Sequence, residues 1–137
     1  MIHLDTNVAI ALLNEQTPRV RARFDAARTA GTPVGLSIIV YYELMYGAAA
    51  SKRRKGNEDK IALFISSGGI ALLPFDVADA IEAADIRAYL KRTAKPIGPY
   101  DLLIAAQARR AGTTLVTANI REFSRVPGLT VMDWAVS

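Results

Sequence analysis

Short apolar segments alternate with longer segments of helical periodicity along the chain, and this alternation restricts the fold more than any other feature. Strands are predicted at residues 2–4, 34–36, 70–75, 114–117 and 129–132. Helices are predicted at residues 8–13, 18–30, 38–50, 58–66, 76–93 and 101–110, with a polar, basic connection at 51–57. Because a helix that joins neighbouring strands makes them parallel, this pattern predicts an α/β fold with a central, mostly parallel sheet and helices on both faces.

Length and composition predict one domain that spans residues 1–137. Of the 137 residues, 51% are apolar and 22% are charged, a balance that argues against global disorder. The chain contains no cysteine, so it has neither a disulfide framework nor a thiolate zinc site. It also contains no apolar run long enough to span a bilayer. We therefore expect a soluble, cytoplasmic protein with no membrane contact.

Basic residues outnumber acidic ones and gather in short clusters. The formal net charge is +4. The clusters are Arg19, Arg21 and Arg23; Lys52, Arg53, Arg54 and Lys55; Lys91, Arg92 and Lys95; and Arg109 and Arg110. Each cluster by itself is typical of a solvated helix face, whereas the four together are also compatible with a polyanionic partner.

Oxygen-bearing side chains recur at the ends of these core segments. Asp5 follows the first strand, Asn119 follows a later strand, Asp101 opens a helix, and Glu43 lies on a helix of mainly apolar residues. Asp5 and Asp101 could be simple helix caps, because aspartate accepts hydrogen bonds from the free amides of a first turn. Glu43 has no such explanation, because a carboxylate among apolar neighbours needs a partner.

Convergence of these acids would explain all of them together. Carboxylates that lie close to one another repel, and a divalent cation removes that repulsion. Mg²⁺ suits such a pocket because it prefers oxygen ligands, needs few protein carboxylates and keeps several waters. Since such waters can attack a phosphodiester, the pattern favours phosphoryl-transfer or nuclease chemistry.

The chain resembles the PIN-domain ribonucleases, and in particular the VapC-type toxins of bacterial toxin–antitoxin modules. Segments in the family's order carry the resemblance, which extends from Met1 to about Trp134: Leu4–Asn7, Tyr42–Gly47, Pro96–Ala106, Leu115–Asn119 and Arg121–Phe123. The resemblance implies a three-layer α/β/α sandwich. It also implies an endoribonuclease that depends on Mg²⁺, with Mn²⁺ as a possible substitute.

The resemblance also assigns roles to individual polar residues. Asp5, Glu43 and Asp101 match the family's triad of metal ligands, and Asn119 falls where many members carry a fourth acid. Because Asn119 is neutral, three acids remain, and we expect one well-occupied ion in the absence of RNA.

Further expectations follow from the same resemblance. Thr6 and Thr117 match positions whose hydroxyl groups support the site. The substrate is expected to be a structured RNA, commonly tRNA, whose cleavage inhibits translation. The partners are expected to be a second copy of the chain in a homodimer and a VapB-like antitoxin that silences the enzyme.

The alternative is a non-catalytic RNA- or protein-binding module of α/β fold, in which the acids are caps and the basic clusters bind the partner. The nuclease is favoured because Glu43 has no role in the alternative. Phosphate-loop and dinucleotide-binding motifs are absent from the sequence, so no organic cofactor is predicted. Tyr41, Tyr42, Met45 and Tyr46 fall near one helical patch, where packing in the core or in a partner groove is favoured over base stacking.

Overall fold

The structure is a computed structural model that describes residues 1–136, and the strands of this range form one parallel sheet. The strands are β1 (Ile2–Leu4), β2 (Val34–Ser37), β3 (Ala71–Leu73), β4 (Thr114–Val116) and β5 (Thr130–Met132). Their order in the sheet is β3-β2-β1-β4-β5, and every neighbouring pair is parallel. The predicted parallel sheet is therefore confirmed.

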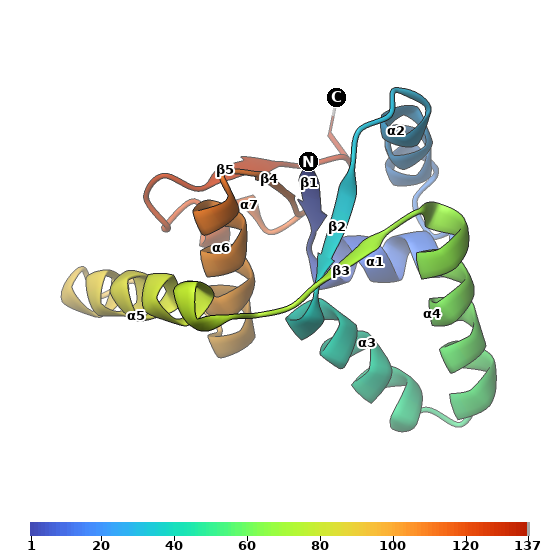
Figure 1. Cartoon of the computed structure of the whole chain (residues 1–137), viewed down its shortest axis with the longest axis horizontal. Coiled ribbons are helices and arrows are strands. Elements are labelled where there is room, and N and C mark those ends of the chain that lie inside the picture. The colour runs from blue at the N-terminus through green and yellow to red at the C-terminus, as the bar shows by residue number, and fades with distance from the viewer. Residues whose placement is uncertain (137) are drawn as a thin grey trace.

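Helices cover both faces of this sheet. They are α1 (Thr6–Leu13), α2 (Pro18–Thr29), α3 (Ile38–Ala49), α4 (Arg54–Gly68), α5 (Val77–Arg92), α6 (Pro99–Ala111) and α7 (Ile120–Phe123). Figure 1 shows α5, α6 and α7 on one side of the sheet, α1, α2 and α4 on the other, and α3 beyond the carboxyl ends of the strands. This arrangement confirms the three-layer α/β/α sandwich.

The central strands are buried because helices pack on both of their faces. Leu4 in β1, Leu36 in β2, and Leu115 and Val116 in β4 have no exposed surface. Strands of this kind read as continuous apolar runs in the sequence, which is why these segments were recognisable. His3 of the central strand β1 is also buried, so it packs between the layers and does not lie at an edge of the sheet.

Several element boundaries differ from those that the sequence predicts. Helix α4 begins at Arg54, so the second half of the predicted connection at 51–57 is helical. Its first turns are stabilised by pairs four residues apart, Arg54 with Glu58 at 3.3 Å and Lys55 with Asp59 at 2.6 Å. The strand predicted at 70–75 ends at Leu73, and the next residue, proline, has no amide to donate to the sheet. Helix α7 was not predicted.

The strand order places a topological switch point at the carboxyl ends of β1 and β4. The chain passes from β1 to β2 and β3 on one side, and then returns across the sheet to β4 and β5 on the other side. The connections that leave β1 and β4 therefore diverge, and open α/β sheets bind ligands at this kind of switch point. Asp5 and Thr117 are the first residues after these two strands.

Helices α5 and α6 are joined by an ion pair between a buried aspartate and an exposed arginine. Asp79 has no exposed surface and accepts a hydrogen bond from Nε of Arg110 at 2.5 Å. It also forms a capping box with Asp76 at the start of α5. Burial by itself would raise the pKa of Asp79. The hydrogen bond and charge of Arg110, together with the backbone amide of Asp76 that donates to the Asp79 carboxylate at 2.9 Å, hold this pKa below its usual value of 3.8.

Among residues 1–136, no helix is both long enough and apolar enough to cross a membrane.

The Asp79→Asn variant should be less stable than the wild-type protein at pH 7. Replacing the carboxylate removes a hydrogen bond between charged groups, a loss of about 1.5–3 kcal/mol. Because the pKa of Asp79 is lowered in the folded state, its contribution is present above pH 3.8 and is lost as the pH falls through the lowered value. The stabilities of the two proteins should therefore become more alike as the pH falls. Thermal unfolding of both proteins from pH 3 to pH 8 measures this change.

The exposed pair Lys55–Asp59 supplies the control. Asp59→Asn removes an ion pair of similar length on the surface, where screening by water leaves little net stabilisation. A stability loss for Asp79→Asn that is no larger than that of Asp59→Asn, or that does not shrink toward low pH, would contradict the assignment.

Candidate active site at the carboxyl ends of β1 and β4

Asp5 lies at the centre of the site and is held by two hydrogen bonds. It is the N-cap of α1, where one carboxylate oxygen accepts the amide of Thr6 at 2.7 Å. The other oxygen accepts the hydroxyl of Thr117 at 2.8 Å. Asp5 is buried and Thr117 is fully buried. The capping role considered for Asp5 is thus real, and it coexists with a position inside an acidic cluster.

Glu43 reaches the same site from α3. Its carboxylate accepts a hydrogen bond from the Thr6 hydroxyl at 2.7 Å, so Thr6 contacts both Asp5 and Glu43. Glu43 is half-buried on a helix that packs against both α1 and α6. This position gives the carboxylate the partner that its apolar helix requires.

Asp101 enters from the first turn of α6. That helix begins at Pro99 and its N-cap is Gly98, so Asp101 lies inside the helix and makes no side-chain cap. The alternative role of Asp101 as a simple cap is therefore wrong. Burial raises the pKa of Asp101 to about 6, and the negative charges of Asp5, Glu122 and Glu43 add to the effect. The three predicted acids thus lie near enough to interact electrostatically.

Glu122 is a fourth acid of the cluster that sequence reasoning did not assign. It lies on α7 and accepts hydrogen bonds from the Gly98 amide and from the Asn119 side-chain amide, each at 2.8 Å. The Gly98 amide is the main reason that the pKa of Glu122 is lowered, and the Asn119 amide adds to it. The interaction between Glu122 and Asp101 raises the pKa of Asp101 and lowers that of Glu122.

Asn119 lies in the cluster, but its amide is directed at Glu122. Its backbone amide donates to the Thr117 hydroxyl at 2.9 Å, and its side chain donates to Glu122 at 2.8 Å. Asn119 therefore positions a carboxylate supplied three residues later. Asn119 and Glu122 are three residues apart, about one helical turn, and this spacing is the feature of the sequence from which their contact could have been predicted. Glu122 adds a fourth negative charge to the three on which the expectation of a single ion rests, and that expectation stays a prediction.

Asp5 is the most strongly desolvated acid of the cluster. Burial raises its pKa above the usual value, the hydrogen bonds from Thr117 and Thr6 act in the opposite direction, and the charges of Glu43 and Glu122 raise it again. Raised values at both Asp5 and Asp101 show that the pocket disfavours its own negative charge. A bound cation would offset this unfavourable negative charge.

The donors of the site suit a hard divalent ion. All of the donors are oxygen atoms of carboxylate, hydroxyl and amide groups, and the chain has no cysteine to offer a softer ligand. Within residues 1–136, no three acidic or histidine side chains are already arranged to hold a metal ion. The carboxylates of Asp5, Glu43 and Glu122 instead take hydrogen bonds from protein donors. The residues therefore fit the chemistry of Mg²⁺ or Mn²⁺, and holding the ion requires carboxylates to turn toward it.

Two tyrosines border this acidic cluster. Tyr42 precedes Glu43 on α3, and Tyr100 precedes Asp101 on α6, with their ring centroids 5.6 Å apart. Both rings are exposed, as is Tyr46, so of the two expected settings for these residues of α3, the core is excluded for Tyr42 and Tyr46, and packing in a partner groove stays a prediction for them. It is correct for Tyr41 and Met45, which pack against the core.

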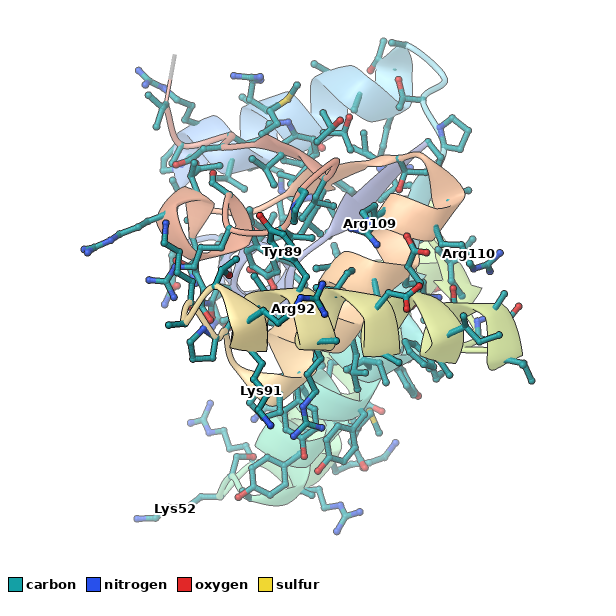
Figure 2. All side chains as sticks on the ribbon, turned by 90° about the vertical axis from the view of Figure 1, so that its left-hand side faces the viewer. Lys52, Tyr89, Lys91, Arg92, Arg109 and Arg110 are labelled. Atoms are coloured by element: carbon teal, nitrogen blue, oxygen red, sulfur yellow. The ribbon has the colours of Figure 1, made fainter. Side chains whose placement is uncertain are left out.

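The basic clusters do not all serve the same purpose. Arg109 and Arg110 form ion pairs with Glu82 and Asp79 of α5, so that cluster joins two helices. Figure 2 shows Arg109 and Arg110 beside α5, whereas Lys91 and Lys52 extend away from the fold. Only part of the positive charge of the chain is therefore available to a polyanion.

The Asp101→Asn variant should melt at a higher temperature than the wild-type protein at pH 7.5 in EDTA. The pKa of Asp101 is about 6 in the folded state against a usual 3.8, so the metal-free protein loses stability as the pH rises through this window. The neutral amide avoids that loss, and we expect a gain of a few degrees. At pH 4 the two proteins should differ little. Thermal unfolding at both pH values, with the exposed Asp85→Asn variant as control, measures the effect; an unchanged or lower melting temperature at pH 7.5 would contradict it.

Comparison with known proteins identifies the family. Residues 2–129 match the model of the PIN domain. The chain is 39% identical over 132 residues to the tRNA(fMet)-specific endonuclease VapC of Shigella flexneri, covering 96% of each chain, and 37% identical to that of Salmonella typhimurium, again covering 96% of each. Ribonuclease VapC2 of Rickettsia felis is 32% identical over the same share of both chains.

Solved structures give the same result for the fold. A chain of VapBC2 from Rickettsia felis bound to a promoter DNA fragment superposes with a TM-score of 0.90 at 31% identity, covering 98% of this chain and 99% of that one. A chain of DNA-bound VapBC from Salmonella typhimurium gives a TM-score of 0.89 at 37% identity, covering 97% of both. The chain therefore belongs to the PIN-domain family and, within it, to the VapC-type endoribonucleases.

Proposed function

We propose that this protein is the toxin of a toxin–antitoxin module, which hydrolyses phosphodiester bonds of tRNA with the help of Mg²⁺ and thereby inhibits translation. The observation that carries the proposal is the cluster of Asp5, Glu43, Asp101 and Glu122 at the switch point of the sheet, where the pKa values of Asp5 and Asp101 are raised. Such a cluster costs stability unless it binds a cation, so a functional role explains it better than a structural one.

The side chains around the cluster divide into ligands and supports. Asp5, Glu43 and Asp101 would hold the ion, and Glu122 would add negative charge beside Asp101. Thr117 and Thr6 fix the Asp5 carboxylate, and Thr6 also fixes Glu43, through the hydrogen bonds described above. When bound, the ion would activate water and stabilise the charge that develops on the phosphate. Mn²⁺ offers the same oxygen chemistry.

A tRNA substrate is supported by the relatives. The enzymes of Shigella flexneri and Salmonella typhimurium are named as tRNA(fMet)-specific, and both are similar to this chain over nearly its whole length. We therefore propose initiator tRNA as the first substrate to test. Basic residues that face solvent, including Lys52 and Lys91, would attract its phosphates.

The partners are proposed on similar grounds. The matching structures are VapBC assemblies, so we propose a VapB-like antitoxin that covers the acidic site with an arginine or lysine. We also propose that the chain forms a homodimer, that residues 1–137 make up one domain, and that the protein acts in the cytoplasm.

Purified protein should cleave initiator tRNA in Mg²⁺ and lose this activity in EDTA. The Asp5→Asn and Asp101→Asn variants should reduce kcat by about 100-fold or more, because each removes charge that stabilises the bound ion, and every 1.36 kcal/mol lost from transition-state stabilisation is tenfold in rate. Gel analysis of tRNA digests measures both effects.

The control is Asp85→Asn, which removes an exposed carboxylate of α5 that is not a member of the cluster, and it should leave kcat unchanged. Cleavage that persists in EDTA, or in folded Asp5→Asn protein, would exclude the metal-dependent mechanism.

Purification from the native operon should yield a stable complex with a small neighbouring gene product. The partner should protect the acidic site, so that tRNA cleavage by the complex is weak and returns when the partner is removed by denaturation and refolding. Mass analysis of the purified complex, with activity measured before and after removal, tests this. Isolation of a free and fully active enzyme from the native operon would argue against an antitoxin.

A further inference from the structure

Tyr42 and Tyr100 form a pair of exposed rings beside the acidic cluster. They come from different helices, and each immediately precedes an acid, Glu43 on α3 and Asp101 on α6. The ring centroids are 5.6 Å apart and the ring planes are inclined by 58°. The rings are 50% and 44% exposed, so neither side chain belongs to the core.

Helix geometry places Tyr100 between the acidic cluster and a groove on the other side of α6. Successive residues of a helix differ by about 100° in direction, so the side chains of Pro99, Tyr100 and Asp101 point in three successive directions around the first turn. Pro99 and Leu103 line a groove of about 810 Å³ with Arg87 and Lys91 of α5. Positive charge thus lies on one side of Tyr100, and the acids lie on the other.

Although the other residues that line this groove are apolar, its two cations and the acids beside the rings fit an RNA strand. A strand needs cations for its phosphates, a centre for the reacting phosphate, and flat surfaces for the bases between them. Figure 2 shows Lys91 extending from α5 toward the end of the molecule where Lys52 follows α3. The basic residues supply the cations, the paired rings supply the flat surfaces, and the acidic cluster supplies the centre for the reacting phosphate.

We propose that Tyr42 and Tyr100 stack against unpaired nucleobases next to the scissile phosphate and so position the strand over the acidic cluster. The inference rests on the proposed endoribonuclease function and adds a substrate-positioning role for two residues. Stacking requires a base with a free face, and the faces of bases inside a paired stem are covered by their neighbours. The pair therefore restricts cleavage to unpaired nucleotides and tolerates different sequences, because every base has an aromatic face.

The first test separates KM from kcat for initiator tRNA. Tyr42→Leu and Tyr100→Leu keep an apolar side chain but remove the aromatic face, so each should raise KM about 10-fold, with kcat changed less than twofold. Tyr42→Phe and Tyr100→Phe keep the ring and should retain the wild-type KM. Tyr46→Leu is the matched control, because Tyr46 is 64% exposed, lies one turn beyond Tyr42 on α3 and is not a member of the Tyr42–Tyr100 ring pair.

The second test changes the RNA. Replacing the nucleotide on either side of the cleavage position with an abasic ribose should raise KM for the wild-type enzyme by a similar factor. In the Tyr→Leu variants the same replacement should add little, because the stacking contact is already lost, and this non-additivity identifies the base as the partner of the ring. A purely structural effect of the substitutions would leave the penalty for the abasic site unchanged.

Failure of the function and failure of this inference give different results. If the wild-type protein cleaves no tRNA, both the proposed function and the proposed role of the tyrosines are wrong. If the wild-type protein cleaves tRNA and the Tyr→Leu variants have an unchanged KM, only the proposed role of the tyrosines is wrong. If the same variants instead dissociate a dimer in size-exclusion chromatography, or release the antitoxin, with unchanged KM, then a second copy or the antitoxin covers the rings and the inference is wrong.

Discussion

The hydrogen bond between the Thr117 hydroxyl and the Asp5 carboxylate joins the two halves of the site. It is buried, and it links the residues that follow β1 and β4, which are 112 positions apart in the chain. From Asp5 the contacts continue through Thr6 to Glu43, and from Thr117 they continue through Asn119 to Glu122 and Gly98. One small hydroxyl therefore fixes the central acid and connects the supports on both sides. The other bonds of the network are partly buried, and each member would lose its partner if its neighbour moved.

The electrostatics of the pocket explain why these supports are needed. Four carboxylates interact electrostatically, and the pKa of Asp101 rises to about 6 while that of Glu122 falls. Repulsion of this kind costs stability in the metal-free protein and becomes useful when a cation or an anionic substrate with its cation enters. The ion pair of Asp79 with Arg110, on the opposite side of α6, helps to hold the helix that carries Asp101 against α5.

The surface around the pocket carries two distinct kinds of side chain. Part of the positive charge joins helices, as Arg109 does with Glu82, and part extends into solvent, as Lys91 does. The exposed rings of Tyr42 and Tyr100 pair with each other, and each immediately precedes an acid of the cluster in the sequence. An enzyme that acts on a long polyanion needs this separation, because the phosphate contacts hold the strand while the contacts to bases set which phosphate reacts.

The sequence by itself determined the layers, the parallel sheet and three of the four acids, because buried strands are apolar runs, and because a carboxylate on an apolar helix, like Glu43, needs a partner. It placed the start of α4 wrongly because pairs such as Lys55 with Asp59 let a basic segment join a helix. Only the tertiary structure decided that Glu122 belongs to the site, that Asn119 serves it, and that Tyr42 faces solvent beside Tyr100. Each of these results depends on which distant segments meet at the switch point. The spacing of residues within one segment does not show which residues of another segment will contact it.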